Sequence, residues 1–302
     1  MKLLKLIEKH FAPILFSFGL LGFLFPKLFS PITDYAYVFL MLNLFLGFLR
    51  VDLSQIASLK QSFLSIVIKS VISVILIPLA VYVLTLGLTK EMRIGLFLLA
   101  SACGGTSVPL FSGLLGFNVL KGGIFVVITS TIIVFSVPYL LSVLYASTAS
   151  FDKVEMGLFL LKVVILPSSL GIIVKKFVRE TTVNKVSSIA PWMGTINLAL
   201  LLGAVIAGKR DTVADYFFSS LTLYGLIGMF LVFLLRFFVG YLMEKNYKER
   251  WGNGLMFVIT NNGLMILLAL QFFSAKEVWV CMLSYIPWTL TYPIIRRLYK
   301  KS

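Results

Sequence analysis

Apolar stretches alternate with short polar joins along the whole of this 302-residue chain. A helix needs about 17–25 mostly apolar residues to cross a lipid bilayer, and ten stretches meet that length. They lie at 8–26, 34–50, 62–88, 93–116, 120–147, 154–176, 188–208, 216–243, 252–273 and 278–297. The pattern predicts an all-α, multi-pass membrane protein with ten transmembrane helices in a single domain, residues 1–302.

The fourth of these stretches contains a break. Its apolar run over 94–100 is followed by Ser101-Ala-Cys-Gly-Gly-Thr-Ser-Val-Pro109, so small residues, hydroxyls and a proline stand where more Leu and Ile are expected. Inside a bilayer every backbone polar group needs a partner, so a break survives only where protein or a water-filled cavity covers it. Such a break is typical of a segment that lines a binding site.

The ninth stretch contains a second break, at Thr260-Asn-Asn-Gly263. The fourth and ninth helices occupy matched places when the chain is divided into two five-helix halves, residues 1–150 and 151–302. An odd number of spans in each half gives the halves opposite orientations in the membrane. The two breaks therefore predict inverted repeats, in which the interrupted helices 4 and 9 cross at the membrane midplane.

Composition and charge agree with a membrane protein. The chain is 59% apolar and 13% charged, with a mean hydropathy of +1.00. Its formal net charge is +15, but the basic residues sit in short joins, so nucleic acid is not an expected partner. With ten spans, one side carries more than twice as many Lys and Arg residues as the other, which predicts a cell-membrane protein with both termini in the cytoplasm. The first helix lacks a cleavage pattern of small residues and is expected to be retained.

Reactive side chains are few. His10 is the only histidine, and Cys103 and Cys281 lie in apolar stretches, so we expect no metal site, disulfide framework or histidine-based acid–base chemistry. No Asp or Glu falls well inside a predicted span, which argues against an intramembrane aspartyl protease and against a buried ion pair. The chain is therefore predicted not to be an enzyme and to need no cofactor.

The two breaks supply the candidate substrate-binding residues. Hydroxyl and amide side chains there could face a cavity, while glycine allows close backbone approach and proline removes a donor. The alternative is that small and polar residues only pack the helices together. The candidates are Gly104, Gly105, Thr106, Ser107, Pro109, Ser112, Thr260, Asn261, Asn262 and Gly263, with Asn43, Asn197 and the run Thr129-Ser-Thr131 as weaker ones.

Three cations lie inside predicted spans. Arg236 is close enough to a helix end for its side chain to reach the membrane surface. Lys69 and Lys162 lie roughly eight residues from their helix ends, about 12 Å deep at the helical rise. An embedded lysine is costly without a partner or a function. Either lysine could attract an anionic substrate, carry a proton with a lowered pKa, or reach water through a local defect.

Three segments carry a resemblance to a known family. They are Asn43-Leu-Phe-Leu-Gly-Phe-Leu-Arg-Val-Asp-Leu53, Gly95-Leu-Phe-Leu-Leu-Ala-Ser-Ala-Cys-Gly-Gly-Thr-Ser107 and Asn261-Asn-Gly-Leu-Met-Ile-Leu-Leu-Ala-Leu-Gln-Phe-Phe273. The chain resembles the bile acid:sodium symporter family over nearly its whole length; the wider superfamily also holds arsenite and auxin-type carriers. The resemblance implies a panel of helices 1, 2, 6 and 7, a core of helices 3–5 and 8–10, and an organic anion bound where helices 4 and 9 cross.

The sequence departs from this family at positions that hold sodium. The family usually continues Gly-Gly-Thr with Ala-Ser-Asn, whose Ser and Asn help to bind sodium, whereas this chain has Val108 and Pro109 in those places. Met256 and Thr260 stand where the ninth helix has Glu and Gln. A sodium ion needs several oxygen ligands, generally including a carboxylate. The ion-site positions at issue are Val108, Pro109, Thr129, Ser130, Thr131, Met256 and Thr260; Lys162 or Lys69 could supply a fixed positive charge instead of the ion.

These observations predict a secondary transporter for a small organic anion that works by alternating access. Its coupling is expected to be proton-linked or absent, with sodium the less favoured ion. A membrane receptor or regulatory subunit that binds a ligand in the same pocket without moving it is the alternative. An ion channel is disfavoured because the sequence has neither rings of charge nor a repeated filter.

Overall fold

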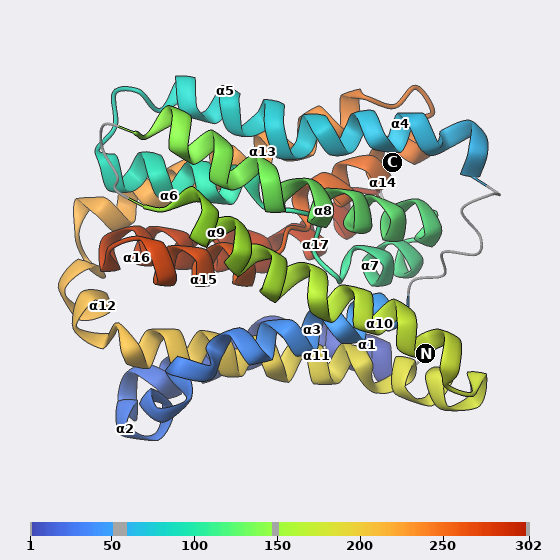
Figure 1. Cartoon of the computed structure of the whole chain (residues 1–302), viewed down its shortest axis with the longest axis horizontal. Helices are drawn as coiled ribbons and strands as arrows, with labels where there is room; N and C mark the ends of the chain where they lie inside the picture. Colours follow the sequence, from blue (N-terminus) through green and yellow to red (C-terminus); the bar gives the residue numbers. More distant parts are fainter. Residues whose placement is uncertain (1, 51–58, 147–150, 300–302) are drawn as a thin grey trace. The chain divides into compact units, whose positions relative to one another are not determined.

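The computed structural model describes residues 2–50, 59–146 and 151–299. Within these ranges the named elements are all helices, and an isolated β-bridge joins Gly104 to Thr260. Figure 1 shows the helices coloured along the chain. The predicted end of the first half at residue 150 lies outside the described ranges.

The helices of the first half are α1 (Lys2–Leu24), α2 (Pro26–Phe29), the 3-10 helix η1 (Ser30–Tyr35), α3 (Ala36–Leu49), α4 (Lys60–Val71), the π-helix η3 (Ile72–Leu76), α5 (Ile77–Leu84), α6 (Lys90–Ser101), α7 (Val108–Leu114) and α8 (Val119–Leu144). Those of the second half are α9 (Lys153–Leu160), the π-helix η4 (Leu161–Ile165), α10 (Leu166–Phe177), α11 (Glu180–Gly208), α12 (Arg210–Tyr216), α13 (Ser220–Leu242), α14 (Tyr247–Val258), α15 (Asn262–Phe272), α16 (Ala275–Leu283) and α17 (Tyr285–Tyr299).

Seven helical segments of the described chain are long and apolar enough to cross a membrane. They correspond to the predicted spans 2, 3, 5, 6, 7, 8 and 10. The apolar part of the first predicted span, His10–Leu24, is a shorter helix. The fourth and ninth predicted spans are each divided into two helices, α6 with α7 and α14 with α15. The chain is therefore a multi-pass membrane protein, and both expected interruptions are present.

Two of the long helices widen into a π-helix, which the hydrophobic pattern did not predict. The π-helix η3 joins α4 to α5, and η4 joins α9 to α10. In each case a proline, Pro78 or Pro167, follows within the first turn of the next helix. Proline has no N–H and its ring clashes with a carbonyl one turn back, so a widened turn accommodates it.

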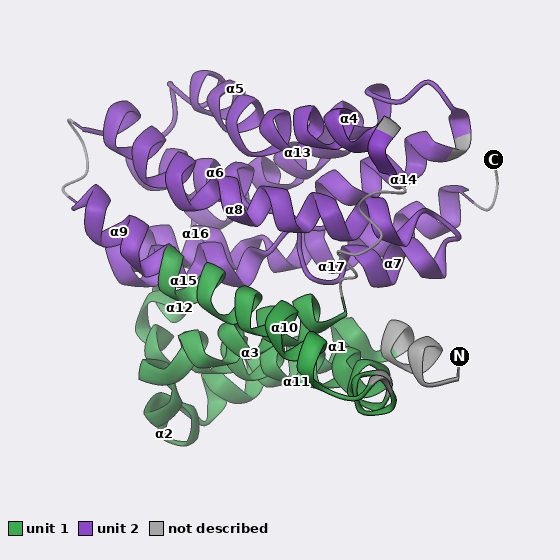
Figure 2. Cartoon of the chain, turned by 45° about the vertical axis from the view of Figure 1, so that its right-hand side comes forward, with its two compact units in different colours: residues 1–51, 161–217 green, residues 52–160, 218–302 purple. Residues whose placement is uncertain are grey.

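The described chain forms two compact units, shown in different colours in Figure 2. Unit 1 comprises residues 1–51 and 161–217, and unit 2 comprises residues 52–160 and 218–302. Unit 1 thus contains the predicted helices 1, 2 and 7 with most of helix 6, and unit 2 contains helices 3–5 and 8–10. This division matches the panel and core that the family resemblance implies, apart from the first turns of helix 6.

Unit 1 is held together by close contact between helix backbones. Helix α1 packs along α11, and α3 packs against both α10 and α11. A Cβ atom on Gly22 of α1 would overlap the carbonyl oxygen of Gly203 on α11. Small residues allow this approach, which is a common way of packing helices in a bilayer.

Unit 2 contains both interrupted helices. Helix α6 packs against α5, α13 and α16, while α14 packs against α13 and α7 packs against α8. Most residues of α6 and α15 are buried, with Phe97 and Leu264 both 0% exposed. The breaks therefore lie in the interior of this unit, where backbone groups without helical partners must bond to other parts of the protein.

Candidate functional site

The first break begins where α6 ends at Ser101. The backbone at Ala102 turns to an extended conformation (φ −60°, ψ 131°), and α7 starts at Val108 with Pro109 in its first turn. Proline suits that position because a first-turn N–H has no helical partner in any case. Thr106 and Ser107 are half-buried, whereas the preceding residues of the break are buried.

The second break separates α14 from α15. Asn261 caps α15, because its Oδ1 accepts a hydrogen bond from the N–H of Leu264 (3.3 Å). The Thr260 hydroxyl donates to Asn262 Oδ1 (2.5 Å), and Asn262 Nδ2 donates to the carbonyl of Ser284 (3.4 Å), between α16 and α17. The adjacent polar side chains predicted here are therefore accommodated by an unwound turn and by bonds within unit 2.

The two breaks are joined to each other by their backbones. The N–H of Gly105 donates to the carbonyl of Ile259 (2.8 Å), and the N–H of Asn261 donates to the carbonyl of Cys103 (2.9 Å). A Cβ atom on Gly105 would lie 2.9 Å from the carbonyl oxygen of Thr260. A glycine is needed at this position because the two interrupted segments approach each other this closely.

Thr129 on α8 bonds to the junction, the place where the backbones of the two breaks are hydrogen-bonded to each other. Its Oγ1 accepts a hydrogen bond from the N–H of Gly104 (3.0 Å) and donates to the carbonyl of Phe125 (2.7 Å). Thr129 and its neighbour Ser130 are buried, whereas Thr131 is exposed. Of the run predicted as ion-site positions, only Thr129 therefore bonds directly to the break.

Arg236 does not reach the membrane surface, so the prediction that it does so is wrong. It is 0% exposed, and its guanidinium donates five hydrogen bonds, three to the ends of the interrupted helices and two to Ser73 on η3. The acceptors are the carbonyls of Phe257 (2.6 Å), Ala100 (2.5 Å), Ala102 (3.1 Å) and Ser73 (3.3 Å), and the Ser73 hydroxyl (2.9 Å). Backbone carbonyls freed by the breaks hold the side chain inside, because hydrogen bonds from a charged donor are stronger than those between neutral groups.

Lys69 also differs from expectation, because it has a carboxylate partner. Its Nζ lies 2.8 Å from Glu244 Oε2, with side-chain exposures of 8% and 23%. Glu244 lies just after α13, and its side chain turns back to a lysine in the last turn of α4, which continues into η3. The expectation of no buried ion pair considered only acids within spans; Glu244 lies outside them, and the pair that it forms with Lys69 is partly buried.

Ser112 and Met256 lie at a different place from the junction. They line a cavity of about 390 Å³ together with residues from α8, α14 and the end of α17, including Asn118, Lys121, Glu249, Asn253 and Tyr299. Lys121 Nζ lies 2.7 Å from Glu249 Oε2 at this cavity. Met256 is 6% exposed and contributes no oxygen ligand, and Val108 is fully buried.

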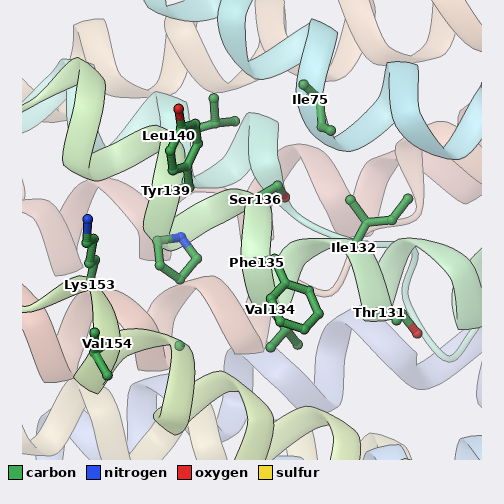
Figure 3. A pocket seen from close by; sticks show the side chains of 12 residues that line it. Ile75, Thr131, Ile132, Val134, Phe135, Ser136, Tyr139, Leu140, Lys153 and Val154 are labelled. Atoms are coloured by element: carbon green, nitrogen blue, oxygen red, sulfur yellow. The ribbon is translucent and has the colours of Figure 1, made fainter.

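Thr131 lines a separate open groove of about 830 Å³ on α8 and α9, shown in Figure 3. Thr131 and Lys153 lie at opposite ends of that view, with mainly apolar side chains such as Val134 and Phe135 between them. The groove therefore does not bring Thr131 to the junction where Thr129 lies.

Two predicted residues belong to unit 1. Asn43 on α3 is 6% exposed, and neither its amide nitrogen nor its amide oxygen has a hydrogen-bond partner within the described chain. Lys162 on η4 is exposed, and its Nζ lies 5.7 Å from the centre of the Tyr37 ring. This contact is a cation–π interaction within unit 1.

The sequence did not single out two residues that bind the embedded cations, Ser73, which bonds to Arg236 at the junction, and Glu244, which pairs with Lys69 away from it. Serine is common in membrane helices, so only the nearby Pro78 marks Ser73 as special. Among the residues that the structure describes, no group of three or more His, Cys, Asp or Glu side chains could hold a metal ion. The polar groups at the junction are backbone carbonyls and N–H groups, hydroxyls, side-chain amides and one guanidinium.

Comparison with known proteins agrees with this architecture. Residues 37–216 match the model of the Sodium Bile acid symporter family, which is more than half of the chain. The chain is also 27% identical over 276 residues to the "Uncharacterized sodium-dependent transporter YocS" of Bacillus subtilis (strain 168), an alignment that covers 88% of this chain and 84% of that protein. This multi-pass membrane protein therefore belongs to the sodium bile acid symporter family of transporters.

Proposed function

We propose that this protein is a secondary transporter for a small organic anion. In this proposal its ten transmembrane helices form two inverted repeats, and unit 1 and unit 2 move relative to one another in alternating access. The substrate is bound beside the junction of the interrupted helices, with Thr106, Ser107 and Asn261 as candidate contacts. Membership of a transporter family supports the reaction class.

The observation that carries the proposal is the pair of interrupted helices joined at their breaks. An interruption of this kind leaves backbone N–H groups at the start of the second half-helix, and these together with the helix dipole favour an anion. Helix α15 begins inside unit 2, and the half-buried hydroxyls of Thr106 and Ser107 belong to the adjacent break. A polar segment of this kind inside a membrane protein supports substrate binding more readily than helix packing alone.

We further propose that transport is proton-linked or uncoupled and does not require sodium. The name of the Bacillus subtilis relative describes that protein as sodium-dependent. In this chain, however, Met256 and Val108 place apolar side chains where the family resemblance expects sodium ligands, and both are buried. Without a carboxylate, sodium would have to be bound by neutral oxygens alone.

Uptake into proteoliposomes tests both parts of the proposal. Radiolabelled taurocholate and a panel of small carboxylates are offered under an inward sodium gradient, an inward proton gradient and neither. We expect uptake of at least one anion that is the same with sodium as with choline. Uptake that rises steeply with sodium alone would contradict the coupling proposal, whereas saturable binding without uptake of any bound anion would favour the receptor alternative.

A further inference from the structure

Arg236 is a buried cation whose hydrogen-bond partners are all neutral. It lies within α13, 0% exposed, and donates to four backbone carbonyls and one hydroxyl. No carboxylate is among the partners that the structure gives this side chain. A buried charge is costly unless its surroundings compensate for it, so the origin of these acceptors needs an explanation.

Two of the acceptors are carbonyls that the breaks deprive of their helical partners. In an unbroken helix the Ala100 carbonyl would accept from the N–H of Gly104, and the Phe257 carbonyl from that of Asn261. Here the N–H of Gly104 donates to Thr129, and the N–H of Asn261 donates to Cys103. Arg236 donates to both remaining carbonyls, at 2.5 Å and 2.6 Å.

A third acceptor is left without a partner by the π-helix η3. In this helix the N–H of Ile77 donates to the carbonyl of Ile72, five residues back. The carbonyl of Ser73 would therefore need the N–H of residue 78, which is a proline and has none. Arg236 donates to that carbonyl (3.3 Å) and to the Ser73 hydroxyl (2.9 Å). One guanidinium thus satisfies carbonyls from three interrupted segments.

The same site has the chemistry of a cation-binding site. The C-terminal ends of α6 and α14 meet here, and each carries free carbonyls and a partial negative charge. Carbonyl and hydroxyl oxygens are also the ligands that a hard cation takes. A positive charge at this point therefore stabilises both breaks, whether it comes from a free ion or from a side chain.

We propose that Arg236 is a tethered cation that fills a cation-binding site formed by the ends of α6 and α14 and by Ser73. Because the charge is covalently attached, it cannot leave with the substrate, and a sodium gradient cannot act through this site. The consequence for coupling rests on the proposed function. The site itself does not, because every residue that forms it lies in unit 2.

The test is chemical rescue of purified variants, read as the apparent Tm in detergent. Arg236→Ala removes the charge and leaves space, so we expect the Tm to fall by roughly 5–15 °C and to recover in part with millimolar methylguanidinium chloride. Arg236→Met removes the charge but fills the space, so a similar loss without recovery is expected. The wild-type Tm should be equal in sodium chloride and in choline chloride at the same ionic strength.

Arg250→Ala is the matched control, because Arg250 donates from Nε to a carbonyl, that of Glu244 (2.8 Å), in the loop after α13. Its Tm should not respond to methylguanidinium. If Arg236→Ala unfolds on purification, the yield of monodisperse protein extracted with and without methylguanidinium gives the same comparison. An Arg236→Ala protein that responds to neither methylguanidinium nor sodium, or a wild-type Tm raised specifically by sodium, would overturn the proposal. None of these measurements needs a substrate, so they stand apart from a failure to observe uptake.

Discussion

Two cations inside apolar helices, Arg236 and Lys69, are compensated in different ways. Arg236 has neutral carbonyl and hydroxyl partners, so its positive charge is not cancelled locally. Lys69 is paired with Glu244, which also accepts a hydrogen bond from Asn253 Nδ2 (3.3 Å). The fixed positive charge in unit 2 that matters for the breaks is therefore that of Arg236, whereas Lys69 joins α4 to the loop after α13.

The Lys69–Glu244 pair should make stability depend on pH in the acid range. Burial raises the pKa of the Glu244 carboxyl. The hydrogen bond and the charge of Lys69 lower it and outweigh burial, so the pKa lies below its usual value of 4.5. A carboxyl whose pKa is lowered by folding contributes stability above its unfolded pKa, and this contribution is lost as the pH falls through the folded pKa. We expect the apparent Tm of the wild type to fall below about pH 4.

Glu244→Gln should remove this contribution at neutral pH, at a cost of about 1–3 kcal/mol because Lys69 stays buried without its counter-ion. The variant should then show a flatter Tm between neutral and acid pH. Glu249→Gln is the control, because the Lys121–Glu249 pair is more exposed, at 22% and 48%, and should change stability by less than about 1 kcal/mol. Equal losses in the two variants would contradict the role given to burial.

These partners could not be predicted from the residues alone. Lys69 and Glu244 are 175 positions apart, and the acid lies outside the apolar stretch. The acceptors of Arg236 are mostly backbone carbonyls, which every residue carries, so no residue type marks them. The position of Arg236 near a helix end favoured reaching the surface, but that inference ignored carbonyls freed in neighbouring helices.

At the level of the helices, the two interruptions depend on each other. Each break supplies one N–H and one carbonyl to the other, through Gly105 with Ile259 and Asn261 with Cys103. Thr129 and Arg236 then satisfy groups that this exchange leaves over. Because each break supplies partners that the other needs, straightening one helix would leave polar groups of the other unsatisfied inside the membrane.

Gly105→Ala tests this close approach. The added Cβ would lie 2.9 Å from the carbonyl oxygen of Thr260, so the breaks must separate and their hydrogen bonds lengthen. We expect a loss of about 1–3 kcal/mol in stability, measured by thermal unfolding in detergent, together with loss of uptake of any transported anion. Gly87→Ala is the control, because a Cβ there meets nothing within 4 Å and should change stability by no more than about 0.5 kcal/mol. A Gly105→Ala protein as stable as this control would show that the contact is not tight.

The sequence was more informative about these helices than about single side chains. Glycine, proline and adjacent polar residues inside apolar stretches correctly indicated both breaks, because their backbone effects are local. The backbone pairing between Gly104 and Thr260 needed the folded arrangement. The π-helices were missed because the pattern of apolar residues does not distinguish a widened turn from a regular one, although Pro78 and Pro167 lie inside the predicted spans 62–88 and 154–176.

At the scale of the whole molecule, the compact units are not the two halves of the chain. Each unit contains helices from both halves, and both breaks fall in unit 2. Inverted repeats produce such an arrangement when equivalent helices of the two halves pack with each other rather than with their sequence neighbours. The division into units is therefore what inverted repeats would give.

The inversion predicts opposite locations for two equivalent loops, which is a measurable property. The loop after α5 contains Gly87 and follows the third predicted helix of the first half; the loop after α13 contains Lys245 and follows the third of the second half. Both residues are exposed. The native cysteines Cys103 and Cys281 are 0% and 2% exposed, so these two thiols should not react with a maleimide. In intact cells a membrane-impermeant maleimide should label Gly87→Cys and not Lys245→Cys, which should react only after permeabilisation.

Labelling of both in intact cells, or of neither before permeabilisation, would place the loops on one side and contradict inverted repeats. The reverse pattern would retain the repeats but place the termini outside the cytoplasm, contrary to the distribution of Lys and Arg.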